Sequence, residues 1–142
     1  MELTINGQVY QFNFGMGFMR EMNKKVTMPV DGVKDVRKNI GLKYAVAEIM
    51  DGDIEVLVDL LDAANNAESE SDKRPAGRYI DDPETDIDKL FEDTLGFLKT
   101  ANATKKTVAE IEKAVAEEKE RQETLKKTLE EFQKKAQSKK EQ

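Results

Sequence analysis

The sequence contains no cysteine and no histidine. Without them the chain has no thiol nucleophile, no disulfide, no Cys/His zinc site and no catalytic triad with an imidazole base. Its three serines, Ser69, Ser71 and Ser138, all lie in strongly polar stretches, and no histidine exists to activate them. We therefore predict that the protein is not an enzyme and that it binds no metal ion and no cofactor.

The sequence also lacks long apolar runs. No stretch approaches the roughly 20 residues that a helix needs to cross a bilayer. The first residues, MELTI, have neither the basic region nor the apolar run of a signal peptide. We expect no membrane association, and the absence of cysteine fits a cytosolic protein.

Charge is unevenly distributed along the 142 residues. Residues 1–104 contain 12 basic and 20 acidic residues, a net charge of −8, whereas residues 105–142 contain 11 and 9, a net charge of +2. The overall charge of −6 argues against non-specific nucleic-acid binding. We predict a compact domain over residues 1–103 and a charged helical extension over residues 104–142. A core this small offers little room for the sheltered cleft of a small-molecule substrate.

Residues 2–14 are predicted to form a β-hairpin. Asn6-Gly7 lies between two alternating runs, and this dipeptide favours a two-residue type I′ turn. That turn pairs Ile5 with Gln8, and the same register gathers the apolar residues on one face. The residues of this face are Met1, Leu3, Ile5, Tyr10, Phe12 and Phe14. Because a lone hairpin is only marginally stable, this face must lie against helices.

A short helix is expected after Gly15 and Gly17, with Phe18, Met19 and Met22 facing inward. The two glycines let the chain turn sharply out of the strand. They do not indicate a nucleotide-binding loop, because the third glycine, the lysine and the βαβ unit of such loops are missing.

The stretch from Ile40 to Ala64 is predicted to form an antiparallel pair of helices. Apolar residues recur at helical spacing in both halves, and Asp51-Gly52-Asp53 supplies the turn between them. Asp53 is expected to cap the second helix. Each helix has an apolar stripe that it cannot bury alone, so the rest of residues 1–103 must cover the pair.

Two stretches contain helix and strand breakers and are predicted to be loops. The first is Thr27–Lys38, which contains Pro29 and Gly32. The second is Asn65–Asp82, a polar stretch that contains Pro75 and that we expect to be mobile.

A further helix is expected to start with Asp82 as its cap and Pro83 in its first position. Its predicted buried stripe consists of Ile87, Leu90, Phe91, Leu95 and Leu98. The acidic residues around this start, and those around Asp51, do not have the glycine and glutamate spacing of a calcium-binding loop. We interpret both clusters as helix starts and solvated surface.

The last predicted helix is capped by Thr104 and ends near Lys135, with residues 136–142 disordered. It is rich in strong helix formers and in opposite charges four residues apart. Its apolar residues follow a heptad pattern that Glu118 and Gln122 interrupt, which is too poor for a permanent coiled coil. Either this is a solvated single helix, or it awaits a partner. The candidate partner-binding residues are Val108, Ile111, Val115, Leu125, Leu129 and Phe132.

These stretches resemble the tail assembly chaperones of long-tailed bacteriophages and prophages of Gram-positive hosts. The resemblance is carried by LTINGQVYQFNF, by FGMGFMREMNKK, by GLKYAVAEIMDGD and by DIDKLFEDTL, and covers residues 2–104. Its most specific points are Asn6-Gly7, residues 14–18 and residues 51–53. All of these are structural markers rather than catalytic ones.

The resemblance implies a mainly α-helical protein with an N-terminal β-hairpin and a specific role. Such a chaperone binds the tape measure protein, keeps it soluble and helps to recruit tail tube subunits. It works in the bacterial host cytoplasm and is absent from the mature virion. The six candidate residues are then expected to contact the tape measure protein or neighbouring copies in a homo-oligomer.

Two other functions remain open from the sequence. One is a structural subunit that is retained in the assembled particle. The other is a regulatory protein that dimerises through its C-terminal helix.

Overall fold

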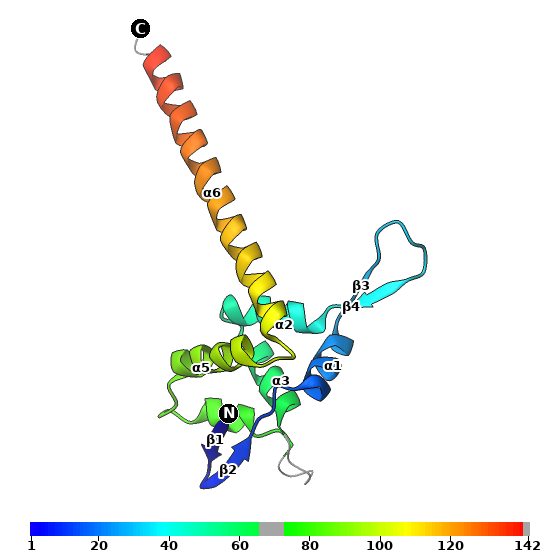
Figure 1. Ribbon diagram of the computed structural model, residues 1–142. Coiled ribbons are helices and arrows are strands. Elements are labelled where there is room, and N and C mark those ends of the chain that lie inside the picture. Colours follow the sequence, from blue (N-terminus) through cyan, green and yellow to red (C-terminus); the bar gives the residue numbers. More distant parts are fainter. Residues whose placement is uncertain (66–72, 141–142) are drawn as a thin grey trace. The chain divides into compact units, whose positions relative to one another are not determined.

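The computed structural model describes residues 1–65 and 73–140 (Figure 1). It divides into two units, Met1–Ala109 and a second unit that begins at Glu110. We call residues 1–109 the head and residues 110–140 the arm. The described part is mainly helical, with an N-terminal two-stranded hairpin and one long C-terminal helix, which confirms the predicted fold class.

The N-terminal hairpin has the predicted register. Strands β1 (Glu2–Ile5) and β2 (Gln8–Gln11) are antiparallel, with Ile5 opposite Gln8. Asn6 and Gly7 both have positive φ, at 50° and 80°, as a type I′ turn requires. Of the predicted apolar face, Met1 and Leu3 are half-buried and the other members are buried: Ile5, Tyr10, Phe12 and Phe14.

Helix α1 (Met16–Lys25) follows the two glycines as predicted and buries Phe18 and Met22. Met19 is half-buried. The phenyl rings of Phe14 and Phe18 meet edge to face, with their centroids 5.2 Å apart, so the end of the hairpin is packed directly on α1.

The prediction of a loop at Thr27–Lys38 is correct for residues 30–36 and wrong at both ends. Strands β3 (Thr27–Pro29) and β4 (Arg37–Asn39) form a second antiparallel hairpin. Its two sides are joined by backbone hydrogen bonds and by the Arg37 side chain, whose Nε donates to Thr27 Oγ1 over 2.9 Å. The residues of β4 are all exposed, so no alternation of apolar and polar side chains revealed the strand in the sequence.

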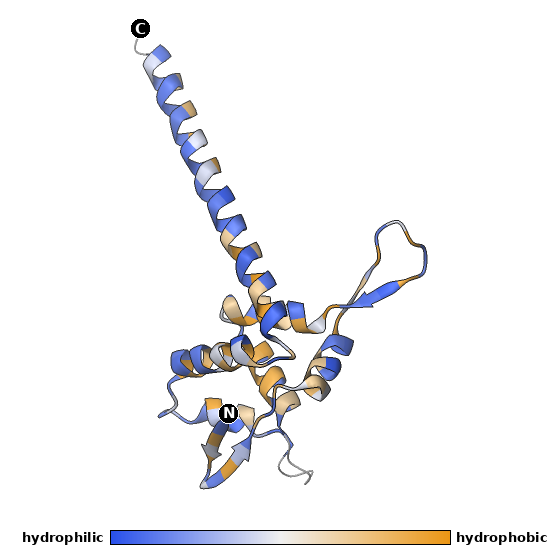
Figure 2. Ribbon diagram, viewed as in Figure 1, coloured by the Kyte–Doolittle hydropathy of each residue, from blue (hydrophilic) through white to orange (hydrophobic). Residues whose placement is uncertain are grey.

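The predicted helix pair is present as α2 (Gly41–Met50) and α3 (Ile54–Ala64). Asp53 caps α3 as expected, because its Oδ1 accepts a hydrogen bond of 3.1 Å from the Val56 amide. The ribbon of α3 is largely hydrophobic in Figure 2. The two helices contribute most of the large, fully buried side chains of the head: Leu42, Val46, Ile49, Leu57, Leu60 and Leu61.

Helices α1 and α2 approach each other closely at Gly41. A Cβ atom at this position would lie 1.7 Å from the Met22 carbonyl oxygen, so only glycine fits. One residue further on, the Leu42 amide donates to Asn23 Oδ1 over 3.1 Å. The Ile40 side chain makes no capping hydrogen bond. Asn23 of α1 therefore caps the N-terminus of α2.

The predicted mobile loop at Asn65–Asp82 contains a helix. Residues 66–72 of this stretch lie outside the described part. Helix α4 (Ala76–Asp81) follows them, and its first residue, Ala76, is buried. The Ala76 amide donates to Asp62 Oδ1 of α3 over 3.2 Å. Burial raises the pKa of the Asp62 carboxyl, and this hydrogen bond partly offsets that effect by stabilising the anion. Asp62 lies 14 residues before the first residue of α4, so the sequence around α4 contains no local sign of this cap. The prediction from sequence therefore does not include α4.

Helix α5 (Ile87–Thr100) starts later than predicted. Its cap is Asp86, whose Oδ1 accepts from the Lys89 amide over 3.0 Å. Asp82 instead accepts from the Glu84 amide and closes a separate turn. Within the predicted stripe Leu90 and Leu98 are buried, whereas Ile87, Phe91 and Leu95 are half-buried.

Helix α6 (Lys105–Lys140) begins in the head and continues through the arm. Thr104 directly precedes α6, and its buried hydroxyl donates to the Leu98 carbonyl of α5 over 2.6 Å. The prediction of disorder from residue 136 is wrong for residues 136–140, which are helical. Residues 141–142 lie outside the described part.

The contact at Gly41 leads to a stability prediction. The substitution Gly41→Ala forces the α1 and α2 backbones apart, and we expect it to destabilise the head by about 1–3 kcal/mol or more. Urea unfolding followed by tyrosine fluorescence measures this in the head alone, because all three tyrosines lie there.

Gly96→Ala is the matched control. A Cβ atom there meets nothing within 4 Å, and replacing an exposed helical glycine should stabilise the head by up to about 1 kcal/mol. Equal effects of the two substitutions would contradict the close approach of α1 and α2.

The cap supplied by Asn23 gives a second prediction. Asn23→Ala removes the acceptor for the Leu42 amide, and we expect a loss of about 1 kcal/mol in the free energy of unfolding. Asn23→Asp keeps an acceptor, and its negative charge is favourable at a helix N-terminus, so it should retain most of the stability. The same urea titration compares the two variants, and a loss as large for Asp as for Ala would show that the amide oxygen is not the capping group.

Candidate partner-binding surfaces

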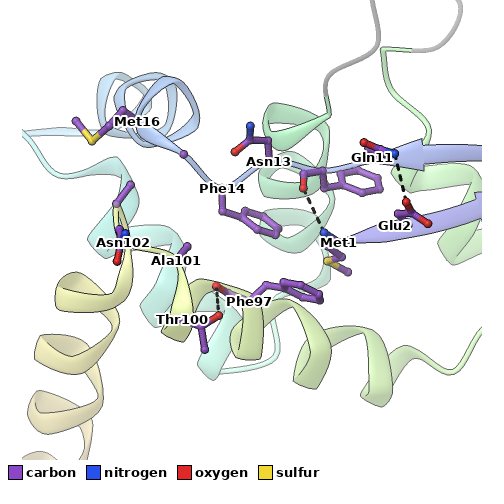
Figure 3. Close-up of a pocket in the computed structure, with 13 residues that line it drawn as sticks. Met1, Glu2, Gln11, Asn13, Phe14, Met16, Phe97, Thr100, Ala101 and Asn102 are labelled. Atoms are coloured by element: carbon purple, nitrogen blue, oxygen red, sulfur yellow. Dashed lines mark hydrogen bonds between the residues drawn. The ribbon is translucent and has the colours of Figure 1, made fainter.

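The head carries an open groove of about 620 Å³ between the end of the N-terminal hairpin and the end of α5 (Figure 3). Phe12 and Phe14, from the segment that follows β2, supply buried aromatic side chains to it. Phe97 of α5 lines the groove too, with its ring centroid 6.4 Å from that of Phe14. The groove is therefore a place where the aromatic core of the head reaches the surface.

Two large apolar side chains of the groove are exposed. Phe97 is 44% exposed and Met16 is 48% exposed. Neither was among the predicted functional residues. Phe97 does not belong to the predicted buried stripe of its helix. An apolar residue outside that stripe is the one feature of the sequence that indicates an exposed contact residue here. Exposed apolar side chains around a groove are typical of a surface that contacts another protein.

The polar groups of the groove are arranged for structure rather than chemistry. Among its described lining residues Glu2 has the only carboxylate, and this accepts a hydrogen bond from Gln11 Nε2 over 3.2 Å. The Met1 amino group lies 3.5 Å from the Phe12 carbonyl oxygen. Thr100 Oγ1 donates to the Phe97 carbonyl within its own helix. A pair of groups suited to general acid and base chemistry does not occur among these residues.

A second depression of about 570 Å³ is lined mainly by charged residues of α1 and α3 and by Lys73 and Arg74. Asp62 is the perturbed group here. Burial raises its pKa and Asp59 adds to this effect, while Arg74 and Lys25 act in the opposite direction. Opposite charges thus partly compensate each other, and the site has no apolar anchor for a partner.

The acidic clusters noted in the sequence serve as helix starts. Asp53 and Asp86 each accept a backbone amide hydrogen bond at the start of their helices. In residues 1–65 and 73–140 no three acidic side chains come together as a metal site requires. Within the same residues no helix combines the length and the apolar character needed to cross a membrane.

The six candidate residues of α6 lie in different environments. Val108 is fully buried in the head, and Ile111 is half-buried. The remaining four are exposed: Val115 at 48%, Leu125 at 60%, Leu129 at 54% and Phe132 at 72%. Val108 is therefore a core residue, and the surface open to a partner consists of Val115 and the three distal residues.

The distal three residues form one continuous strip, which we call the arm stripe: Leu125, Leu129 and Phe132. At 100° per residue their side chains lie within about 60° of one another around the helix axis. Val115 lies more than two turns away from this strip, beyond the polar Glu118 and Gln122. In Figure 2 the distal half of α6 is mostly hydrophilic, with the apolar residues standing out singly.

Comparison with known proteins identifies the family. A family model described as phage tail assembly chaperone protein, TAC, matches residues 2–113. No curated protein and no solved structure matches the chain. The matched residues span the whole head and the first residues of the arm, and they include the N-terminal hairpin and the α2–α3 pair on which the resemblance rested. The chain therefore belongs to the family of phage tail assembly chaperones.

Proposed function

We propose that this chaperone binds the tape measure protein of a long-tailed phage, keeps it soluble and helps to recruit tail tube subunits. In this proposal it acts in the cytoplasm of the bacterial host and is not retained in the finished virion. The observation that carries the proposal is the exposed arm stripe on an otherwise charged helix.

The arm stripe is suited to reversible binding. Complete burial of a Leu or Phe side chain is worth about 1.5–3 kcal/mol, so the three residues offer a gross gain of about 5–9 kcal/mol. Association itself costs several kcal/mol, and the surplus supports weak binding by one copy. A chaperone that must leave before the tail is complete needs contacts of this strength, which several copies along one partner can add together.

Recruitment of tube subunits requires a second contact on the same chain. The head groove, with Met16 and Phe97 exposed, is an apolar surface separate in sequence from the arm stripe. A chain with two such surfaces can hold two different proteins at once. This supports a role in bringing tube subunits to the tape measure protein.

The proposal predicts the effect of removing the arm stripe. The triple substitution Leu125→Ser, Leu129→Ser and Phe132→Ser removes most of the apolar area of the distal arm. We expect it to weaken binding to the tape measure protein by at least about 100-fold, because the loss amounts to several kcal/mol. Co-expression of the two proteins, followed by measurement of the soluble fraction of the tape measure protein, checks this.

A matched control places three serines on the outer side of the same helix, at Glu123, Glu130 and Lys134. All three positions are exposed, and the change disturbs helix propensity to a similar extent. This control should solubilise the tape measure protein as the wild type does. Equal solubilisation by the arm-stripe variant would contradict the proposed role of the arm.

A further inference from the structure

The charges beside the arm stripe all have one sign. In a heptad labelled a to g, Leu129 occupies an a position and Leu125 and Phe132 occupy d positions. The neighbouring e and g positions between residues 119 and 140 contain five charged residues, and every one is basic. They are Lys119, Arg121, Lys126, Lys135 and Lys140, and all are exposed. The other flanking residues, Thr128 and Gln133, are neutral.

The acidic residues of the same segment lie elsewhere. They occupy the outer b, c and f positions, away from the stripe: Glu120, Glu123, Glu130 and Glu131. Next to this segment, Glu118 at a d position accepts a hydrogen bond from Arg121, but both side chains are more than half exposed, so this ion pair is weak. A partner helix seated on the stripe would therefore face a nearly unbroken basic border.

We infer that residues 119–140 of the arm bind an amphipathic helix whose own apolar seam is flanked by acidic residues, and that they reject a second copy of the arm. Charges at e and g positions decide which helices pair and in which orientation. In a parallel pair of arms Arg121 would face Lys126 of the other copy, and Lys135 would face Lys140. An antiparallel pair would also place basic residues opposite one another. Like charges in these positions destabilise a pair, whereas acidic flanks on a partner would stabilise it.

The inference rests on the proposed function and makes it more specific. It describes the tape measure segment that the arm binds as a helix with acidic borders. A polyanionic surface such as a membrane or a nucleic acid also attracts lysines, and residues 105–142 have a net charge of +2. The glutamates on the outer face of the arm and the net charge of −8 of residues 1–104 oppose close approach to such a surface. Residues 114–140 lie outside the family match, so this property is argued from their own sequence and exposure.

The test uses the full-length protein and two synthetic helical peptides of equal length. Both peptides have leucine at a and d positions; one has glutamate and the other has lysine at e and g positions. Fluorescence anisotropy should show at least about tenfold tighter binding of the acidic peptide, with a difference that shrinks as salt is added. The double substitution Lys126→Glu and Lys135→Glu should reverse the preference. The control Lys127→Glu and Lys134→Glu changes the same charge at outer f positions and should retain it.

Three results would overturn the inference. These are equal binding of both peptides, dimerisation of the full-length protein through the arm at micromolar concentration, and binding to phosphatidylglycerol vesicles without binding to the acidic peptide.

Co-expression with the tape measure protein separates this inference from the proposed function. If the wild type and the Lys126→Glu, Lys135→Glu variant solubilise it equally, the inference fails and the function stands. If the wild type does not solubilise it, the proposed function fails, and the peptide measurement still decides which flanks the arm prefers.

Discussion

The head depends on burial of the two apolar helices α2 and α3. Leu57, Leu60 and Leu61 of α3 are fully buried, and Val46 of α2 is too. A pair of short helices cannot shield side chains on so many sides, so buried residues of the N-terminal hairpin, α1, α4, α5 and the start of α6 supply the cover. The close approach at Gly41 brings α1 onto α2, and Val108 extends the cover into the first turns of α6.

This constraint explains how apolar residues are divided along the chain. The head buries many of its large apolar side chains in its core; those that it exposes include Met16 and Phe97 at the groove and others away from it, such as Val9, Val33 and Ile54. The arm has too few apolar residues to form a core, and four of its large ones are exposed: Val115, Leu125, Leu129 and Phe132. Under the proposed function, such a separation would let the folded unit stay intact while a partner covers and leaves the exposed strip.

Much of the head could be predicted from sequence, because its signals are local. The Asn6-Gly7 turn and the Asp53 cap each depend on residues within four positions of one another, and both were found. What was missed depends on distant residues. Helix α4 begins at a hydrogen bond from Ala76 to Asp62, and the β3–β4 hairpin is joined by backbone pairing of exposed residues. Periodicity alone identifies the candidate residues of α6. It does not reveal where a helix leaves the head, and it therefore groups the buried Val108 with the exposed Phe132.

The central claim is that the arm is an open helix whose apolar stripe is covered by a partner. Hydrogen exchange measured by mass spectrometry tests it most directly, with the full-length protein alone and in complex with the tape measure protein. Alone, amides of residues 119–140 should exchange far faster than those of α2 and α3, because a single helix without tertiary packing is only marginally stable. In the complex the same amides should become strongly protected. Strong protection of the arm in the free protein, or an unchanged arm in the complex, would contradict the account.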